Sequence, residues 1–232
     1  LFKYAAWLRE LLHIRKSATL RTYEDKKASV RNRNLALALA GRDIGELPEV
    51  THPEHKAACE RNFRLFCETY FPNIFYFPWS RDHHMVIEKI ERAIVSGGLF
   101  AVAMPRGSGK TVLMQVACLW AALTGSSQFI TLVAASSERA EKLLDTMKMW
   151  LETNELLYED FPEVIYPIRA LERVVHRQKG QKYRDEATRI EWLTDKVVFP
   201  YIEGSRAAGV AISCSGLKGS DLRGLNHSRP DG

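Results

Sequence analysis

Residues 99–111 place the strongest constraint on how this chain can fold. The stretch begins as an uncharged apolar run and breaks at Pro105-Arg-Gly-Ser-Gly109, within a segment that we call the glycine loop (residues 104–111). A helix-like apolar pattern follows over residues 112–123. A strand that ends in a glycine turn and continues as a helix brings backbone N–H groups and the positive helix end to one point. This order of elements predicts a binding site for phosphate groups.

The residue types of the glycine loop suit a nucleoside triphosphate. Gly107 and Gly109 let the backbone close on the phosphates. The ammonium group of Lys110 reaches the β- and γ-phosphates, and the hydroxyl group of Thr111 holds Mg²⁺. The consensus G-x-x-x-x-G-K-[ST] has glycine where this chain has Met104, so the first turn needs another backbone geometry. A glycine-rich turn with a solvated lysine is the alternative interpretation. We predict that ATP and Mg²⁺ are bound by Pro105, Arg106, Gly107, Ser108, Gly109, Lys110 and Thr111.

Composition and charge indicate a globular protein with a basic N-terminal segment. The chain has 232 residues, 46% of them hydrophobic, which is enough for one α/β core and an appendage. Its net charge is +5, and residues 1–50 hold ten Lys and Arg against six Asp and Glu. The excess of positive charge is therefore concentrated in this segment. A surface that docks DNA or a partner and a solvated helix face are both compatible with it.

The cysteines indicate a reducing environment. They form no C-x-x-C pair, and the sequence shows neither a secretory signal nor a long uncharged apolar span. We therefore expect a cytosolic protein that does not enter a membrane. His52, His55 and Cys59 have a spacing that could ligate zinc, but no fourth ligand is apparent, so a polar helix start is the favoured interpretation.

The pattern along the chain predicts three regions. They are a basic helical segment (1–50), a helical lead-in with an aromatic cluster (51–98) and an α/β core (99–232). Within the lead-in we expect helices over residues 54–70 and 83–94, and the aromatic residues between them either pack on the core or stack on bases. The intervening prolines favour packing.

The core region alternates between strand-like and helix-like segments. After the glycine loop and its helix we expect a strand over 128–134, a helix with apolar residues from Ala140 to Leu151, and strands over 197–202 and 210–215. Residues 172–192 are compatible with a helix or a solvent-facing hairpin. Alternation of this kind predicts a parallel sheet with right-handed crossovers and flanking helices.

Three segments together carry a resemblance to a known family. They are Pro105-Arg-Gly-Ser-Gly-Lys-Thr111, Val198-Phe-Pro-Tyr-Ile-Glu-Gly204, and Asp221-Leu-Arg-Gly-Leu225 shortly before Arg229-Pro-Asp231. This combination resembles the ATPase half of bacteriophage terminase large subunits, the motors that package viral DNA. The resemblance covers roughly residues 70–231. It implies an α/β P-loop NTPase fold of the ASCE type, with a mainly parallel sheet flanked by helices and an N-terminal helical segment.

The resemblance also implies an activity and roles for named residues. A terminase ATPase hydrolyses ATP with Mg²⁺ and translocates double-stranded DNA into a procapsid. Lys110 and Arg106 would then be catalytic, with Arg106 stabilising the γ-phosphate charge in cis. Arg223 and Gly224 would couple the ATP state to DNA or act on a neighbouring subunit. The helix at His83 and His84 would lie beside the adenine, where the family often has glutamine.

By the same resemblance, the partners and location are those of a packaging motor. We expect a homo-oligomeric ring that contacts double-stranded DNA, the portal protein and the small terminase subunit, in the host cytoplasm and transiently at the procapsid portal. Two other functions stay open. One is a different P-loop DNA helicase or remodelling ATPase, and the other is a nucleotide-gated assembly module that does not hydrolyse ATP.

The acidic residues of such a motor are not found in this sequence. The family places an Mg²⁺-holding aspartate and a water-activating glutamate on a strand directly after Arg-Pro-Asp, the Walker B strand. We therefore expect the ATPase core to be cut off before that strand, and efficient hydrolysis to need sequence beyond Gly232. Glu203 also follows an apolar run, but Pro200 interrupts that run, so we predict an edge-strand residue rather than a catalytic base.

Overall fold

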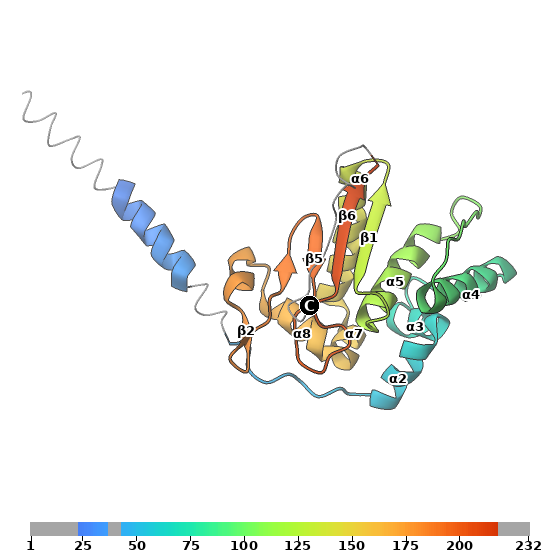
Figure 1. Cartoon of the computed structure of the whole chain (residues 1–232), viewed down its shortest axis with the longest axis horizontal. Coiled ribbons are helices and arrows are strands. Elements are labelled where there is room, and N and C mark those ends of the chain that lie inside the picture. Colours follow the sequence, from blue (N-terminus) through green and yellow to red (C-terminus); the bar gives the residue numbers. More distant parts are fainter. Residues whose placement is uncertain (1–22, 37–42, 218–232) are drawn as a thin grey trace, which may run out of the picture.

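The computed structural model describes residues 23–36 and 43–217 as a mixed α/β structure (Figure 1). Residues 23–36 are helical. The elements that follow are α2 (Pro53–Arg61), α3 (Phe63–Tyr70), α4 (Arg81–Ser96), α5 (Lys110–Leu123), β1 (Phe129–Ala134), α6 (Ser137–Thr153), α7 (Glu155–Asp160), α8 (Pro162–Ala170), the 3-10 helix η1 (Val175–Gly180), β2 (Lys182–Tyr183), β3 (Glu186–Ala187), β4 (Glu191–Trp192), β5 (Lys196–Val198) and β6 (Ala211–Gly216).

The main sheet has the strand order β1-β6-β5-β4 and is mixed. β1 and β6 run parallel, in register from Phe129 opposite Ala211 to Ala134 opposite Gly216. β5 is antiparallel to both β6 and β4. The expected mainly parallel sheet is thus not what the described strands form. The reason lies in the connections: β1 reaches β6 through helices, whereas β4, β5 and β6 follow one another without a crossover helix.

The apolar run over residues 99–104 is not a strand, contrary to the prediction. None of these residues joins a ladder in the described part of the chain, and the Leu99 side chain is fully exposed (102%). The connection from α4 to α5 stands away from the sheet (Figure 1). An extended segment needs a neighbouring strand to satisfy its N–H and C=O groups, so hydrophobicity alone did not make this run a strand.

The helices before the glycine loop form largely as predicted. The expected helix over 54–70 is two helices, because Asn62 adopts an extended backbone and its side chain accepts the Leu65 N–H at 2.8 Å, capping α3. α4 begins after Ser80, whose hydroxyl accepts the His83 N–H at 3.4 Å. It ends at Gly97, whose φ of +74° is accessible to glycine with little strain.

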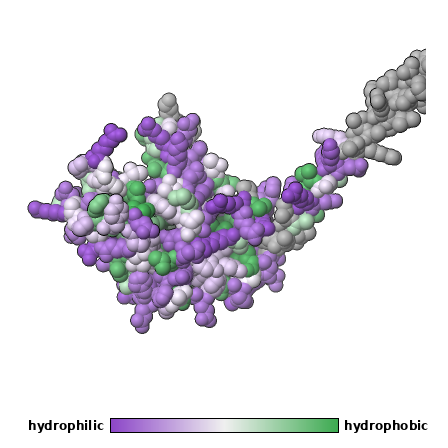
Figure 2. Space-filling model, turned by 180° about the vertical axis from the view of Figure 1, so that it is seen from behind, coloured by the Kyte–Doolittle hydropathy of each residue, from purple (hydrophilic) through white to green (hydrophobic). Residues whose placement is uncertain are grey.

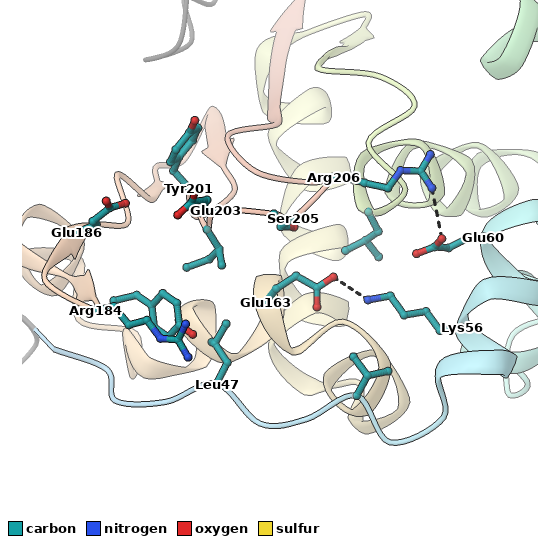
Figure 3. A pocket seen from close by; sticks show the side chains of 15 residues that line it. Leu47, Lys56, Glu60, Glu163, Arg184, Glu186, Tyr201, Glu203, Ser205 and Arg206 are labelled. Atoms are coloured by element: carbon teal, nitrogen blue, oxygen red, sulfur yellow. Dashed lines mark hydrogen bonds and ion pairs between the residues drawn. The ribbon is translucent and has the colours of Figure 1, made fainter.

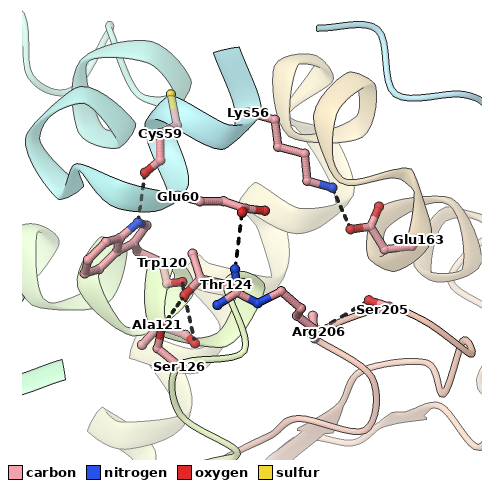
Figure 4. Close-up of polar contacts among 11 residues, drawn as sticks. Lys56, Cys59, Glu60, Trp120, Ala121, Thr124, Ser126, Glu163, Ser205 and Arg206 are labelled. Atoms are coloured by element: carbon pink, nitrogen blue, oxygen red, sulfur yellow. Dashed lines mark hydrogen bonds and ion pairs between the residues drawn. The ribbon is translucent and has the colours of Figure 1, made fainter. Parts of the chain in front are cut away.

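Aromatic and aliphatic side chains from α3, α5, α6, α7 and α8 form the core. The ring centroids of Phe66 and Tyr70 lie 4.7 Å apart. Trp120 on α5 donates its indole N–H to the Cys59 carbonyl at 3.0 Å, which fastens α5 to α2 (Figure 4). α6 packs against β1 and β6, and its apolar stripe is buried as predicted, through Ala140, Leu144, Met147 and Leu151.

Sequence analysis missed α7 and α8. Both have recognisable starts: the Asn154 side chain accepts the Leu157 N–H at 3.1 Å, and Pro162 occupies the first position of α8. They were missed because each is short and shows little periodicity. Residues 172–192, which we expected to form a helix or a hairpin, form both: the helix η1 is followed by the antiparallel pair β2 and β3.

The helical part of the basic segment, residues 23–36, is separate from the rest of the structure (Figures 1 and 2). Every residue in it except Asn34 is exposed. Its exposure fits both interpretations of the basic charge, a docking surface and a solvated face. The other residues of the segment up to residue 42 lie outside the described ranges.

The buried cysteines lead to a prediction about pH. Burial raises the pKa of the Cys118 thiol from 9.0 to about 11, and raises that of Cys67 further. Above about pH 9 the unfolded chain releases thiol protons that the folded chain retains, so raising the pH favours unfolding. We expect the free energy of unfolding, measured with urea, to fall between about pH 8 and about pH 10, and to fall less steeply in Cys118→Ala. A flat or rising profile would contradict this.

Candidate functional site

The glycine loop has the backbone geometry of an anion-binding turn. Gly107 and Gly109 have φ values of +84° and +74°, and Gly109 is the left-handed residue directly before α5. A left-handed residue followed by a right-handed one turns successive N–H groups toward one point, a concavity that binds anions. No atom lies within 4 Å of where a Cβ would stand on either glycine. The loop therefore leaves open space beside its backbone.

Lys110 folds back over the glycine loop. Its Nζ donates to the carbonyl oxygens of Met104 at 2.6 Å and Pro105 at 2.7 Å. The ammonium group thus lies next to the first turn of α5, whose unpaired N–H groups add positive potential. The loop is closed by a turn in which the Ser108 N–H approaches the Pro105 carbonyl at 3.4 Å. Both backbone dipoles and a full positive charge favour an anion here.

Ser108 contributes an unused hydrogen-bonding group. Its hydroxyl oxygen is buried and has no hydrogen-bond partner. Buried polar atoms without partners are uncommon, and each calls for a physical explanation. A phosphate oxygen would satisfy this hydroxyl, so the residues present fit a polyphosphate.

Thr111 lies at the mouth of a cavity of ≈ 400 Å³ between α5, β1 and α6. The lining residues include Lys110, Thr111, Gln115 and Thr131, and none of them is acidic. Mg²⁺ is usually held by one or two carboxylates together with phosphate oxygens and water. Among the described residues, no group of three or more His, Cys, Asp or Glu side chains could hold a metal ion. The lining of this cavity thus offers no carboxylate to Mg²⁺, and Thr111 contributes a hydroxyl group.

His83 links α4 to the glycine loop. Its Nε2 lies 3.0 Å from the Ser108 carbonyl oxygen, and its Nδ1 lies 2.7 Å from the Ser80 hydroxyl. Sequence analysis placed His83 only near a base. The contact with the loop could not be read from the sequence, because 25 residues separate the partners.

The other predicted site residues are not gathered at the loop. Arg106 is exposed, and no ion pair involving it is seen in the described part of the chain. Arg223 and Gly224, with the Arg-Pro-Asp segment, lie outside the described residues. Glu203 lies in a turn after β5 rather than on an edge strand. It lines a different cavity, of ≈ 710 Å³, to which no residue of the glycine loop contributes (Figure 3).

This larger cavity lies between α2, α8, the β2–β3 hairpin and the segment after β5 (Figure 3). Its basic side chains are already paired. Lys56 contacts Glu163 at 2.7 Å and Arg206 contacts Glu60 at 3.4 Å (Figures 3 and 4). Arg184 contacts Glu46 at 2.7 Å. These pairs join segments far apart in the sequence, so the lining indicates a structural junction rather than an anion site.

The residues considered for zinc form part of a polar cluster at the start of α2. The Nδ1 atoms of His52 and His55 lie 3.8 Å and 3.7 Å from the Asp160 carboxylate. Tyr70 donates its hydroxyl to the same carboxylate at 2.6 Å, and burial together with this hydrogen bond raises the pKa of Tyr70. The arrangement matches a polar helix start anchored to a buried aspartate.

Comparison with protein-family models, with curated proteins and with solved structures found no significant match. Within residues 23–36 and 43–217, no helix is both long and apolar enough to cross a membrane. The face seen in Figure 2 is mostly hydrophilic, with small separated hydrophobic areas.

Proposed function

We propose that this chain binds Mg-ATP at the glycine loop and is the ATPase motor domain of a bacteriophage terminase large subunit. One observation carries the binding part of the proposal. Gly109 is left-handed at the N-terminus of the 14-residue helix α5, beside the ammonium group of Lys110. Backbone N–H groups, the helix end and a lysine then converge on one anion. The assignment to a P-loop ATPase of the ASCE type and to the terminase family comes from the sequence resemblance.

Each residue of the loop has a role in this proposal. The backbone N–H groups at Gly109 and Lys110 donate to the phosphates, and Ser108 donates its hydroxyl. When the nucleotide binds, the Lys110 ammonium group breaks its hydrogen bonds to the Met104 and Pro105 carbonyls and moves to the β- and γ-phosphates. Thr111 holds Mg²⁺, which neutralises charge on those phosphate oxygens.

Hydrolysis needs a group that orients water, and the cavity beside Thr111 is lined by no carboxylate. We therefore assign the water-orienting role to none of the residues that line this cavity. Arg106 stabilises charge on the γ-phosphate as it transfers, an arginine-finger role in cis. Arg223 and Gly224 couple the nucleotide state to double-stranded DNA within a ring of subunits, which works with the portal protein and the small terminase subunit.

Phosphate release tests this proposal. We expect these 232 residues to bind ATP but to release phosphate slowly, because no carboxylate lines the cavity beside Thr111 to orient the attacking water. Rapid release that is abolished by Glu203→Gln would contradict this expectation and identify Glu203 as the group that activates water. In the complete subunit, long double-stranded DNA should stimulate release. Stimulation by single-stranded DNA with strand separation would instead indicate a helicase.

A further inference from the structure

The hydrogen bonds of His83 define which ring nitrogen carries the proton. The Ser108 carbonyl can only accept, so Nε2 carries the hydrogen and donates to it at 3.0 Å. In the neutral ring, Nδ1 then accepts the Ser80 hydroxyl at 2.7 Å and the Ser80 N–H at 3.4 Å. The Trp79 ring meets the imidazole edge-on, with centroids 5.7 Å apart. The imidazole is thus held from both nitrogens and one side.

This contact sets the direction of a backbone N–H in the glycine loop. The Ser108–Gly109 peptide bond is trans, like the other peptide bonds of the described chain. In a trans peptide the C=O and the following N–H point in opposite directions. Because His83 holds the Ser108 carbonyl toward α4, the Gly109 N–H points away from α4. Gly109 is the left-handed residue that opens the anion-binding turn.

We infer that His83 is a positioning residue that keeps the Gly109 N–H aimed at the phosphates. This inference rests on the proposed nucleotide site. It differs from the expectation that the helix at His83 lies beside the adenine, because here the imidazole acts on the phosphate-binding backbone. Removing the His83 hydrogen bond should therefore weaken the binding of any polyphosphate, whether or not a base is attached.

The test compares two amides of different length at the same position. In His83→Gln the amide N–H can take the place of Nε2, whereas in His83→Asn the side chain is one methylene shorter and falls short of Ser108. His176→Asn, at an exposed position in η1, is the matched control, since no hydrogen bond from the His176 side chain is seen among the described residues. Binding of ATP and of inorganic tripolyphosphate is measured by calorimetry with the whole chain.

We expect His83→Asn to lower the affinity for both ligands about five- to tenfold, as the loss of one hydrogen bond predicts. The affinities of His83→Gln and His176→Asn should stay within about twofold of those of the unmodified chain. Loss of ATP binding with unchanged tripolyphosphate binding would mean a contact with the base and would overturn the inference. So would equal losses in the Gln and Asn variants, or a lower melting temperature with unchanged affinities.

The same experiment separates this inference from the proposed function. If the unmodified chain binds neither ATP nor tripolyphosphate, the proposed nucleotide site fails, and the inference with it. If it binds both through Lys110 and His83→Asn changes neither affinity, the nucleotide site stands and the role of His83 is rejected.

Discussion

Replacing Lys110 with alanine is expected to weaken ATP binding about 10- to 100-fold, which is the range for a lost hydrogen bond to a charged group. In the structure the Lys110 ammonium already lies within the glycine loop, 2.6 Å from the Met104 carbonyl oxygen. It therefore needs only a short movement to reach a bound phosphate. Under the proposed ATPase function, the loss of this charge-stabilising donor should slow phosphate release by about 100- to 1000-fold.

The control for this experiment is Lys89→Ala, which removes a lysine from the exposed face of α4 and leaves the glycine loop intact. Both variants have the same change in net charge, so a non-specific electrostatic effect would appear in both. Calorimetry with ATP measures affinity, and the rise in melting temperature with added ATP provides a second readout. Equal ATP affinities in Lys110→Ala and Lys89→Ala would refute nucleotide binding at this loop.

The second large effect is expected from Phe71→Ala, which should reduce the free energy of unfolding by about 3–5 kcal/mol. Phe71 is 3% exposed, and its ring meets that of Trp150 edge-on with centroids 5.1 Å apart. Truncation removes this packing and leaves a cavity between α3 and α6. For a domain of this size the melting temperature should fall by about 10 °C.

Phe77→Ala is the matched control, because it makes the same chemical change a few residues along the same cluster. The Phe77 side chain is 69% exposed, and the free energy of unfolding should change by less than about 0.5 kcal/mol. Urea unfolding measures both variants. Similar losses in the two would show that the division of this cluster into buried and exposed rings is wrong.

This division also refines the two interpretations of the aromatic cluster. The prediction of packing holds for Phe71, whereas Tyr76 and Phe77 lie exposed with their rings 4.2 Å apart. For Tyr76 and Phe77 the alternative interpretation, a surface that stacks on bases, stays open. Periodicity could not separate these rings, because the prolines at 72 and 78 remove any regular spacing between them.

Local patterns in the sequence determined several elements of this protein by themselves. The apolar stripe from Ala140 to Leu151 predicted α6, and the pattern over residues 83–94 predicted the body of α4. The glycines at 107 and 109 predicted the sharp turn before α5, and both have positive φ. Helix caps, turns and apolar stripes depend on residues a few positions apart along the chain. They can therefore be predicted from the sequence.

Only the tertiary structure decided the rest. The run over residues 99–104 is as apolar as β1, but a strand also needs a strand to pair with, and none of the described strands pairs with it. The antiparallel direction of β5 depends on how the chain returns after β4. The contact between His83 and Ser108 depends on how α4 packs against the loop. Each of these outcomes is set by partners distant in the sequence, whose arrangement no local pattern specifies.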